Sequence, residues 1–469
     1  MTRTIRLWSV GRIPVALGVL LVSAGSALGQ VDFSVYRSLG DSLTHGTQGG
    51  KVVDHRTQPF AYPVYLADKA GASFALPLLT QAAADETQSR LDAPNFSYGA
   101  NLAVNGADLH EALYHTADAL VPPGYKSKDL TDCVLAPRTG ATQVSAAVSD
   151  GATFTTVWLG GNDFLNSLSQ AGTVLHDFYG YYGLSEPVEP LNVSGITDQA
   201  SFATDYADLM NTLMAVPGMK MAVANLPVIN NLAAVLDKDQ VTALVGSNPM
   251  PEHAMTNELV VAAIMYDDVG TFGADIWDVD MLANPDNYWD ANEATAIDAA
   301  ITGFNATIAS QAGVHDVALV DFHGLLTEIE GGQYSVGGWE LNDEWFVANV
   351  GQEKASFYSS DGLHPSDIGH AVVANAFIDA INDHYGSSIQ RLSEAEQKDI
   401  LDHDRFVDND LDGRIEGITS NVAEWTVNFF VPDYTGDAPD IPEPTSLALF
   451  ASGGILALSC RRHRAPRRH

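Results

Sequence analysis

A serine, an aspartate and a histidine have the types and spacing that nucleophilic catalysis requires. Ser42 closes a Gly-Asp-Ser stretch directly after an apolar run, so the glycine allows a tight turn and the serine falls at the end of a predicted strand. Asp361 and His364 stand three residues apart in an Asp-Gly-Leu-His-Pro stretch, where the carboxylate can orient the imidazole and stabilise its cation. These residues are the candidate nucleophile, orienting acid and general base of a serine hydrolase.

Two further segments offer hydrogen-bond donors to an anion. Gly106 can present a backbone N–H unobstructed by any side chain, and Asn162, in a Gly-Gly-Asn-Asp stretch after another apolar run, offers its carboxamide. With the N–H of Ser42 they would form an oxyanion hole, in which each donor contributes about 3–4 kcal/mol because charge grows on the bound oxygen. Each residue alone also fits a helix cap or a turn, so the interpretation depends on the complete set. The sequence contains no Gly-x-Ser-x-Gly, the nucleophile elbow of α/β-hydrolases.

The elements that must position these residues are predicted from periodicity. Apolar runs that end at turn-forming residues predict buried parallel strands, because both faces of such strands are covered. Helical spacing of apolar residues predicts helices at 203–216 and 294–312. Parallel strands need crossover helices, so a doubly wound α/β fold follows. Two long insertions, at about 44–95 and 230–290, are expected to shape a binding site. The predicted strands span residues 33–39, 154–159, 219–224 and 317–320.

In order along residues 33–383, the four segments resemble the four sequence blocks of the SGNH/GDSL hydrolase family of esterases and lipases. The resemblance implies an SGNH-type three-layer sandwich with a mostly parallel, flavodoxin-like sheet. It also implies carboxylic ester hydrolysis without a catalytic cofactor. Ser42 would attack the ester carbonyl, His364 would move the proton, and Asp361 would orient His364. The oxyanion would be held by Ser42 and by the two donors named above, Gly106 and Asn162.

The natural ester stays open. After the nucleophile the chain reads Thr-His-Gly instead of the aspartate-containing stretch of many lipase-like members. Lipid, lysophospholipid and acetylated carbohydrate esters are all candidate substrates, because fold and triad do not set specificity. The alternative function is a catalytically silent envelope or matrix binding module that reuses the fold.

The first 29 residues have the three zones of a secretory signal peptide. Arg3, Arg6 and Arg12 precede an apolar run, and Ala27-Leu28-Gly29 supplies the small residues of a signal peptidase site before Gln30. The run is shorter than the ~20 residues that span a bilayer. We therefore expect export.

The last residues resemble a PEP-CTERM sorting signal, which exosortases process. A Pro-Glu-Pro tripeptide at 442–444 precedes an apolar stretch at 447–460 and a cluster of arginines, which favours the cytoplasmic side of a membrane. A plain single-span anchor is the alternative. The sorting signal predicts a location in the cell envelope or the extracellular matrix, and a plain anchor would also place the protein at an envelope.

An acidic stretch at 408–416 resembles the calcium loop of an EF-hand. Oxygen ligands fall at the expected spacing, a glycine stands at the sixth position, and a helical lead-in at 393–403 precedes the loop. The last position is Thr419 and not the usual bidentate glutamate, so a solvated acidic turn is the alternative. The candidate ligands of a structural Ca²⁺ are Asp408, Asp410, Asp412, Arg414 through its carbonyl, and Glu416.

Charge and cysteine content set further bounds. The chain has 23 Lys and Arg against 59 Asp and Glu, a net charge of −36, which opposes binding to nucleic acid. One of its two cysteines, Cys460, lies in the sorting segment, so no disulfide is expected within the mature protein. The predicted organisation is a signal peptide (1–29), an SGNH hydrolase domain (30–390), an EF-hand-like acidic appendage (391–440) and a sorting signal with a short transmembrane stretch (441–469).

Overall fold

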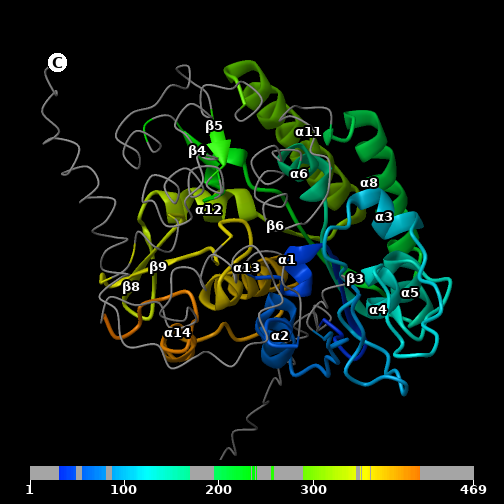
Figure 1. Ribbon diagram of the computed structural model, residues 1–469. Helices are drawn as coiled ribbons and strands as arrows, with labels where there is room; N and C mark the ends of the chain where they lie inside the picture. Colours follow the sequence, from blue (N-terminus) through cyan, green and yellow to red (C-terminus); the bar gives the residue numbers. More distant parts are fainter. Residues whose placement is uncertain are drawn as a thin grey trace, which may run out of the picture.

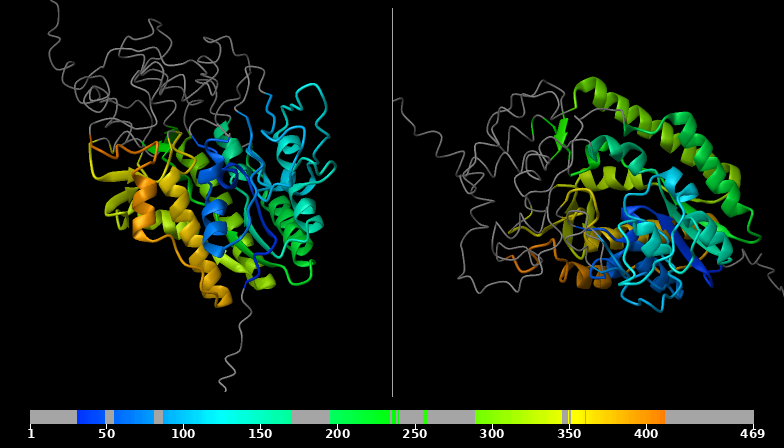
Figure 2. Two further views of the ribbon diagram at one scale, coloured as in Figure 1. Left: turned by 90° about the horizontal axis from the view of Figure 1, so that it is seen from below. Right: turned by 45° about the vertical axis from the view of Figure 1, so that its right-hand side comes forward.

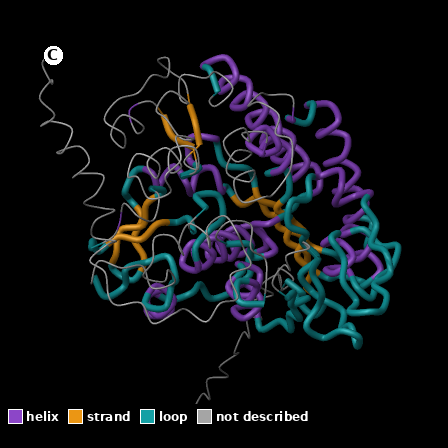
Figure 3. The backbone as a smooth tube through the Cα atoms, in the orientation of Figure 1, coloured by secondary structure: helices purple, strands orange, loops and turns teal. Residues whose placement is uncertain are grey.

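A four-stranded parallel sheet forms the centre of the computed structural model (Figures 1 and 3). Its strands are β1 (Tyr36–Gly40), β2 (Phe154–Trp158), β3 (Lys220–Ala224) and β6 (Ala318–Val320), in the order β1-β2-β3-β6. The four predicted strands are confirmed. The structure describes residues 31–48, 55–80, 87–169, 195–233, 235–237, 239, 255–257, 289–344, 349, 351–359 and 361–411.

Helices cover the sheet as a three-layer α/β fold requires (Figure 2). Helix α13 (Asp367–Tyr385) packs on β3 and β6 and also contacts α2 (Tyr62–Ala70). Helices α5 (Gln143–Ser149), α8 (Gln199–Met214) and α11 (Ala291–His315) form a second packed group. The predicted mostly parallel α/β sandwich is thus confirmed.

The two helices that periodicity predicted are confirmed, and both begin earlier than the apolar pattern indicated. Asp198 caps α8 by accepting the N–H groups of Ala200 and Ser201 at 3.1 and 3.0 Å. Asp290 and Glu293 form a capping box at the start of α11. The first turn of each helix is polar and is stabilised by its cap, so the spacing of apolar residues does not reveal it.

Shorter elements connect and flank these layers. The helices among them are α1 (Ser42–His45), η1 (Gln58–Phe60), α3 (Leu109–Tyr114), α4 (Leu130–Leu135), α6 (Asn162–Ser169), η3 (Ile229–Asn231), α12 (Phe322–Glu330) and α14 (Glu394–Leu401). Two small sheets contain β4 (Val235–Asp237) with β5 (Met255–Asn257), and β7 (Tyr334–Val336), β8 (Trp339–Asn342) and β9 (Lys354–Ser356).

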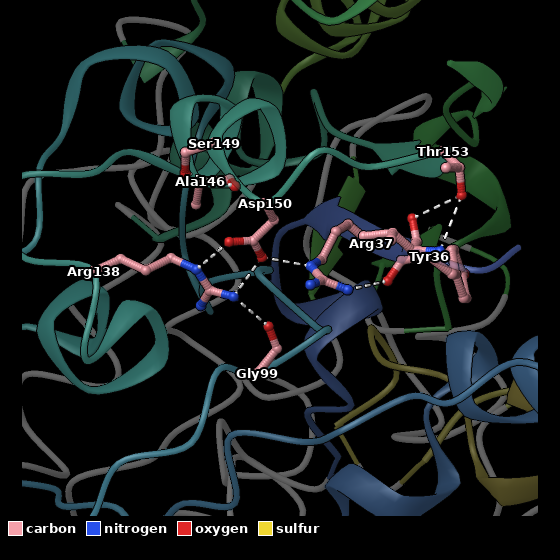
Figure 4. A network of polar contacts seen from close by, with 9 residues as sticks. Tyr36, Arg37, Gly99, Arg138, Ala146, Ser149, Asp150 and Thr153 are labelled. Atoms are coloured by element: carbon pink, nitrogen blue, oxygen red, sulfur yellow. Dashed lines mark hydrogen bonds and ion pairs between the residues drawn. The ribbon is translucent and has the colours of Figure 1, made fainter. Parts of the chain in front are cut away.

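A buried ion-pair network ties strand β1 to the turn after α5 (Figure 4). Asp150 accepts a hydrogen bond from Arg37 Nε at 2.6 Å. It also accepts two from the guanidinium of Arg138, at 2.6 and 3.1 Å. Arg138 also donates to the carbonyl oxygen of Gly99 at 2.8 Å. The two arginines outweigh the effect of burial and lower the pKa of Asp150. One carboxylate therefore joins three segments at this edge of the sheet.

The described part of the predicted appendage packs on the sandwich. Helix α14 corresponds to the predicted helical lead-in, begins with a capping box at Ser393, and contacts α13 and β7. The signal peptide, the sorting signal and most of the acidic loop lie outside the described residues. Among the residues that are described, no helix is long and apolar enough to cross a membrane.

Candidate active site

Ser42 lies at the carboxyl edge of the sheet, in the first turn of α1. Strand β1 ends at Gly40, and Asp41 caps α1 by accepting the N–H of Leu43 at 3.0 Å. A Cβ on Gly40 would lie 2.1 Å from Thr44 Oγ1, so only glycine fits this turn. The serine itself is 7% exposed. The local sequence thus folds as predicted and places a hydroxyl at the end of a strand.

Asp361 and His364 form a buried, hydrogen-bonded pair. His364 Nδ1 and Asp361 Oδ2 are 2.6 Å apart, and Asp361 Oδ1 accepts the N–H of His364 at 2.9 Å and that of Leu363 at 3.0 Å. Burial alone would raise the pKa of Asp361, but the charge and hydrogen bonds of His364 lower it to about 2. An ionised Asp361 makes Nδ1 the donor, which leaves Nε2 as the basic nitrogen.

The segments that carry Ser42 and His364 meet through α13. Gln48, three residues after α1, donates to Asp367, the first residue of α13, at 2.7 Å. His364 lies three residues before that helix, and its interaction with Asp41, the neighbour of Ser42, partly offsets the burial that raises the pKa of Asp41. The nucleophile loop and the Asp–His loop are therefore joined at the same edge of the sheet.

Both candidate oxyanion donors lie at this edge. The segment before Gly106 runs beside β1, where the N–H of Val104 donates to the carbonyl oxygen of Gly40 at 3.1 Å. Gly106 has φ +83, and a Cβ there would meet nothing within 4 Å. Asn162 begins α6 directly after β2, and its Nδ2 donates to the carbonyl oxygen of Ala107 at 2.9 Å. This bond fixes the two donor segments to each other and leaves a second amide hydrogen on Asn162.

Asp41 and Gln143 support the segment of the candidate nucleophile Ser42, and sequence reasoning assigned a role to neither. Burial raises the pKa of Asp41 to about 7, and a Cβ on Gly161 would lie 2.9 Å from its carboxylate. Gln143 accepts the N–H of Gly40 through Oε1 at 3.0 Å. Asp41 directly precedes Ser42 in the Gly-Asp-Ser stretch, so its position in the sequence could have indicated a role. Gln143 lies 103 residues from its partner, and no local pattern indicates that contact.

The acidic loop is described only at its start. Asp408 accepts the N–H of Gly351 at 2.8 Å, and Asp410 is also described. Asp412, Arg414 and Glu416 lie outside the described residues. Within the described ranges, no group of three or more His, Cys, Asp or Glu side chains could hold a metal ion. The calcium site stays a prediction.

A serine at the carboxyl edge of a parallel sheet, with an Asp–His pair on a joined loop, is the layout of an α/β serine hydrolase. Residues 37–377 match the family described as GDSL-like Lipase/Acylhydrolase. The chain belongs to this family and is a carboxylic ester hydrolase.

Solved structures that match this chain include proteins named as a lipase, an acetyl xylan esterase and a phospholipase. A GDSL-like lipase from Parabacteroides merdae has 10% identity and a TM-score of 0.35, over 75% of this chain and 97% of that one. An acetyl xylan esterase from Geobacillus stearothermophilus has 9% identity and a TM-score of 0.34, over 74% and 93%. A phospholipase A1 from Streptomyces albidoflavus has 15% identity and a TM-score of 0.28, over 74% and 98%. No curated protein matches the sequence.

Proposed function

We propose that this chain is an exported serine esterase that uses Ser42, His364 and Asp361 as a catalytic triad. The observation that carries the proposal is the 2.6 Å contact between His364 Nδ1 and Asp361 Oδ2, on a loop joined to the segment of the nucleophile. Family membership supports ester hydrolysis as the reaction.

The proposed reaction has two halves. His364 Nε2 takes the hydroxyl proton of Ser42 as the oxygen attacks the ester carbonyl, and then gives this proton to the departing alcohol. In the second half water attacks the acyl-enzyme while His364 takes a proton from it, and His364 then gives this proton to Ser42 Oγ as the acid leaves. The N–H groups of Ser42 and Gly106 and the amide of Asn162 would stabilise the oxyanion in both halves.

The activity is tested with p-nitrophenyl acetate, butyrate and palmitate on wild type, Ser42→Ala and His364→Ala. We expect both variants to lose kcat by three orders of magnitude or more, and we expect a fluorophosphonate to label only chains that retain Ser42. Labelling of Ser42→Ala equal to that of wild type would contradict the assignment. No turnover and no labelling by a folded wild type would favour the binding module.

The proposed location rests on the two terminal signals of the sequence. Processing by signal peptidase and exosortase would leave a protein that begins at Gln30 and ends near residue 440. Mass spectrometry of the protein recovered outside the cytoplasm tests both cuts. An intact first segment in that fraction would refute the signal peptide.

The proposed calcium site is tested by titration of Ca²⁺ into the full-length protein and into Asp412→Asn. We expect binding in the wild type and at least tenfold weaker binding in the variant, because a carboxylate ligand is lost. Equal heats of Ca²⁺ binding in the two proteins, measured by titration calorimetry, would show that the loop is a solvated acidic turn.

A further inference from the structure

A pocket of about 330 Å³, whose lining is both polar and apolar, lies beside Gly106. Four segments form its wall: the loop of residues 104–107, helix α3, the stretch before and within the first turn of α4, and the first residue of α5. The volume is at the lower end of the range of small-molecule sites, ~300–1,000 Å³. The candidate oxyanion donor Gly106 is part of the wall, so the pocket adjoins the candidate oxyanion hole.

Gln143 gives the pocket a buried donor. The residue is 2% exposed, and its Oε1 is used by the N–H of Gly40 at 3.0 Å. Its Nε2 donates to no residue of the described part of the chain, although the side chain belongs to the pocket wall. This amide donor is therefore available to a ligand that supplies an acceptor oxygen in the pocket.

Other residues of the wall carry charged groups of both signs. His115 Nε2 and Asp129 Oδ2 are 2.5 Å apart and join the end of α3 to the start of α4. The Asp129 hydrogen bond raises the pKa of His115. Glu111 and Lys128 also line the pocket. The cavity therefore contains amide, imidazole, carboxylate and ammonium groups.

These groups discriminate between the two main classes of ester. A long alkyl chain in this pocket would remove water from several charged groups and return no hydrogen bond. A hydroxyl both donates and accepts, so a sugar ring can bond to the carboxylates and to the amide at the same time.

We propose that this pocket is the subsite for a sugar unit that carries the scissile ester, and that Gln143 contacts that unit. The proposal rests on the esterase function proposed above and names its substrate class, an O-acetylated carbohydrate.

The test compares 6-O-acetylglucose with hexyl acetate, two esters with the same acyl group and different alcohols. In the full-length wild type we expect kcat/KM to be at least tenfold higher for the sugar ester. His115→Ala and Gln143→Glu should lower the ratio of the two kcat/KM values about tenfold. Gln143→Glu keeps an acceptor for Gly40 and loses the amide donor. A mere displacement of the nucleophile would slow both esters alike and leave the ratio unchanged.

His110→Ala is the matched control. His110 lies in α3, the helix that ends just before His115. It also pairs with an aspartate, Asp205, at 2.9 Å, but it is not part of the pocket wall. We expect the wild-type ratio in this variant. A wild-type preference for hexyl acetate, or a ratio that neither pocket variant changes, would overturn the subsite while hydrolysis itself upheld the esterase.

A binding measurement separates the subsite from catalysis. Saturation-transfer NMR with 6-O-acetylglucose should give a signal with Ser42→Ala and a much weaker one with the double variant Ser42→Ala/His115→Ala. Equal signals would overturn the sugar subsite whether or not the wild type hydrolyses esters.

Discussion

Asp361 receives two backbone N–H groups in addition to the imidazole of His364. Such a carboxylate does more than neutralise a charge, because it fixes both the orientation and the tautomer of the ring. Replacing it by asparagine keeps the size but lets the amide meet the ring in the wrong tautomer. For Asp361→Asn we expect kcat to fall by ~10³–10⁴ with little change in KM, measured with p-nitrophenyl acetate.

The control is Asp379→Asn, an aspartate that is 46% exposed on its side chain and lies 3.6 Å from Arg391. We expect its kcat to equal that of the wild type. If Asp361→Asn retained more than a tenth of the wild-type kcat, Asp361 would not be the orienting residue.

Asp41 and Asp361 make the free energy of unfolding depend on pH in opposite directions. Burial raises its pKa to about 7, above the ~3.9 of an aspartate in an unfolded chain. Between these values the folded protein holds a proton that the unfolded chain has lost, so this residue lowers the free energy of unfolding as pH rises from ~4 to ~7. Asp361 has a lowered pKa, and its contribution is lost only as pH falls below ~4 toward 2.

Asp41→Asn removes the titration and keeps an acceptor for the N–H of Leu43. Relative to wild type, the variant should gain stability as pH is raised from 5 to 8, as measured by urea unfolding. A difference that is constant across this range would show that Asp41 does not titrate there.

At the scale of elements, the C-terminal segment secures the helix that follows the candidate catalytic residue His364. Asp404 accepts the N–H of Ile368 at 2.7 Å, and Arg405 donates to both Asp367 and Gln48. Loss of Arg405 would leave the buried Asp367 with a weaker counter-charge. We expect Arg405→Ala to lower the free energy of unfolding by roughly 1.5–3 kcal/mol, the range for hydrogen bonds to charged groups.

Arg391→Ala is the matched comparison, since Arg391 is 52% exposed and its pair with Asp379 is a surface contact. It should cost at most about 1 kcal/mol. Equal losses in the two variants would indicate that the segment of Arg405 does not stabilise α13.

The elements were also the most predictable part of the molecule. Buried parallel strands and long helices have local apolar patterns, and these appeared at β1 and α11 near the predicted residues. The contacts of Gln143 with Gly40 and of Gln48 with Asp367 join residues 103 and 319 positions apart. Periodicity describes one segment at a time, so it cannot report which distant polar side chains will meet.

At the scale of the whole molecule, one carboxylate holds the edge strand in place. Asp150 is 10% exposed and pairs with Arg138, which is 4% exposed, and with Arg37. Asp150→Asn would leave two arginines short of a counter-charge. We expect a loss of about 3 kcal/mol in the free energy of unfolding, measured by urea unfolding.

Glu340→Gln serves as its control, because Glu340 pairs with Lys354 at 3.0 Å on the surface. Its loss should stay below about 1 kcal/mol. A loss for Asp150→Asn that is no larger than this would contradict the structural role of the network.

The hydrogen bond between Gln48 and Asp367 can form only late in the synthesis of the chain. These residues are 319 positions apart, so at ~5–20 residues per second the ribosome makes the second one roughly 15 to 65 s after the first. Throughout that interval Ser42 has been synthesised and its histidine has not. On the proposed mechanism, the growing chain can therefore meet esters in the compartment of its synthesis without cleaving them until residue 364 of 469 has been made.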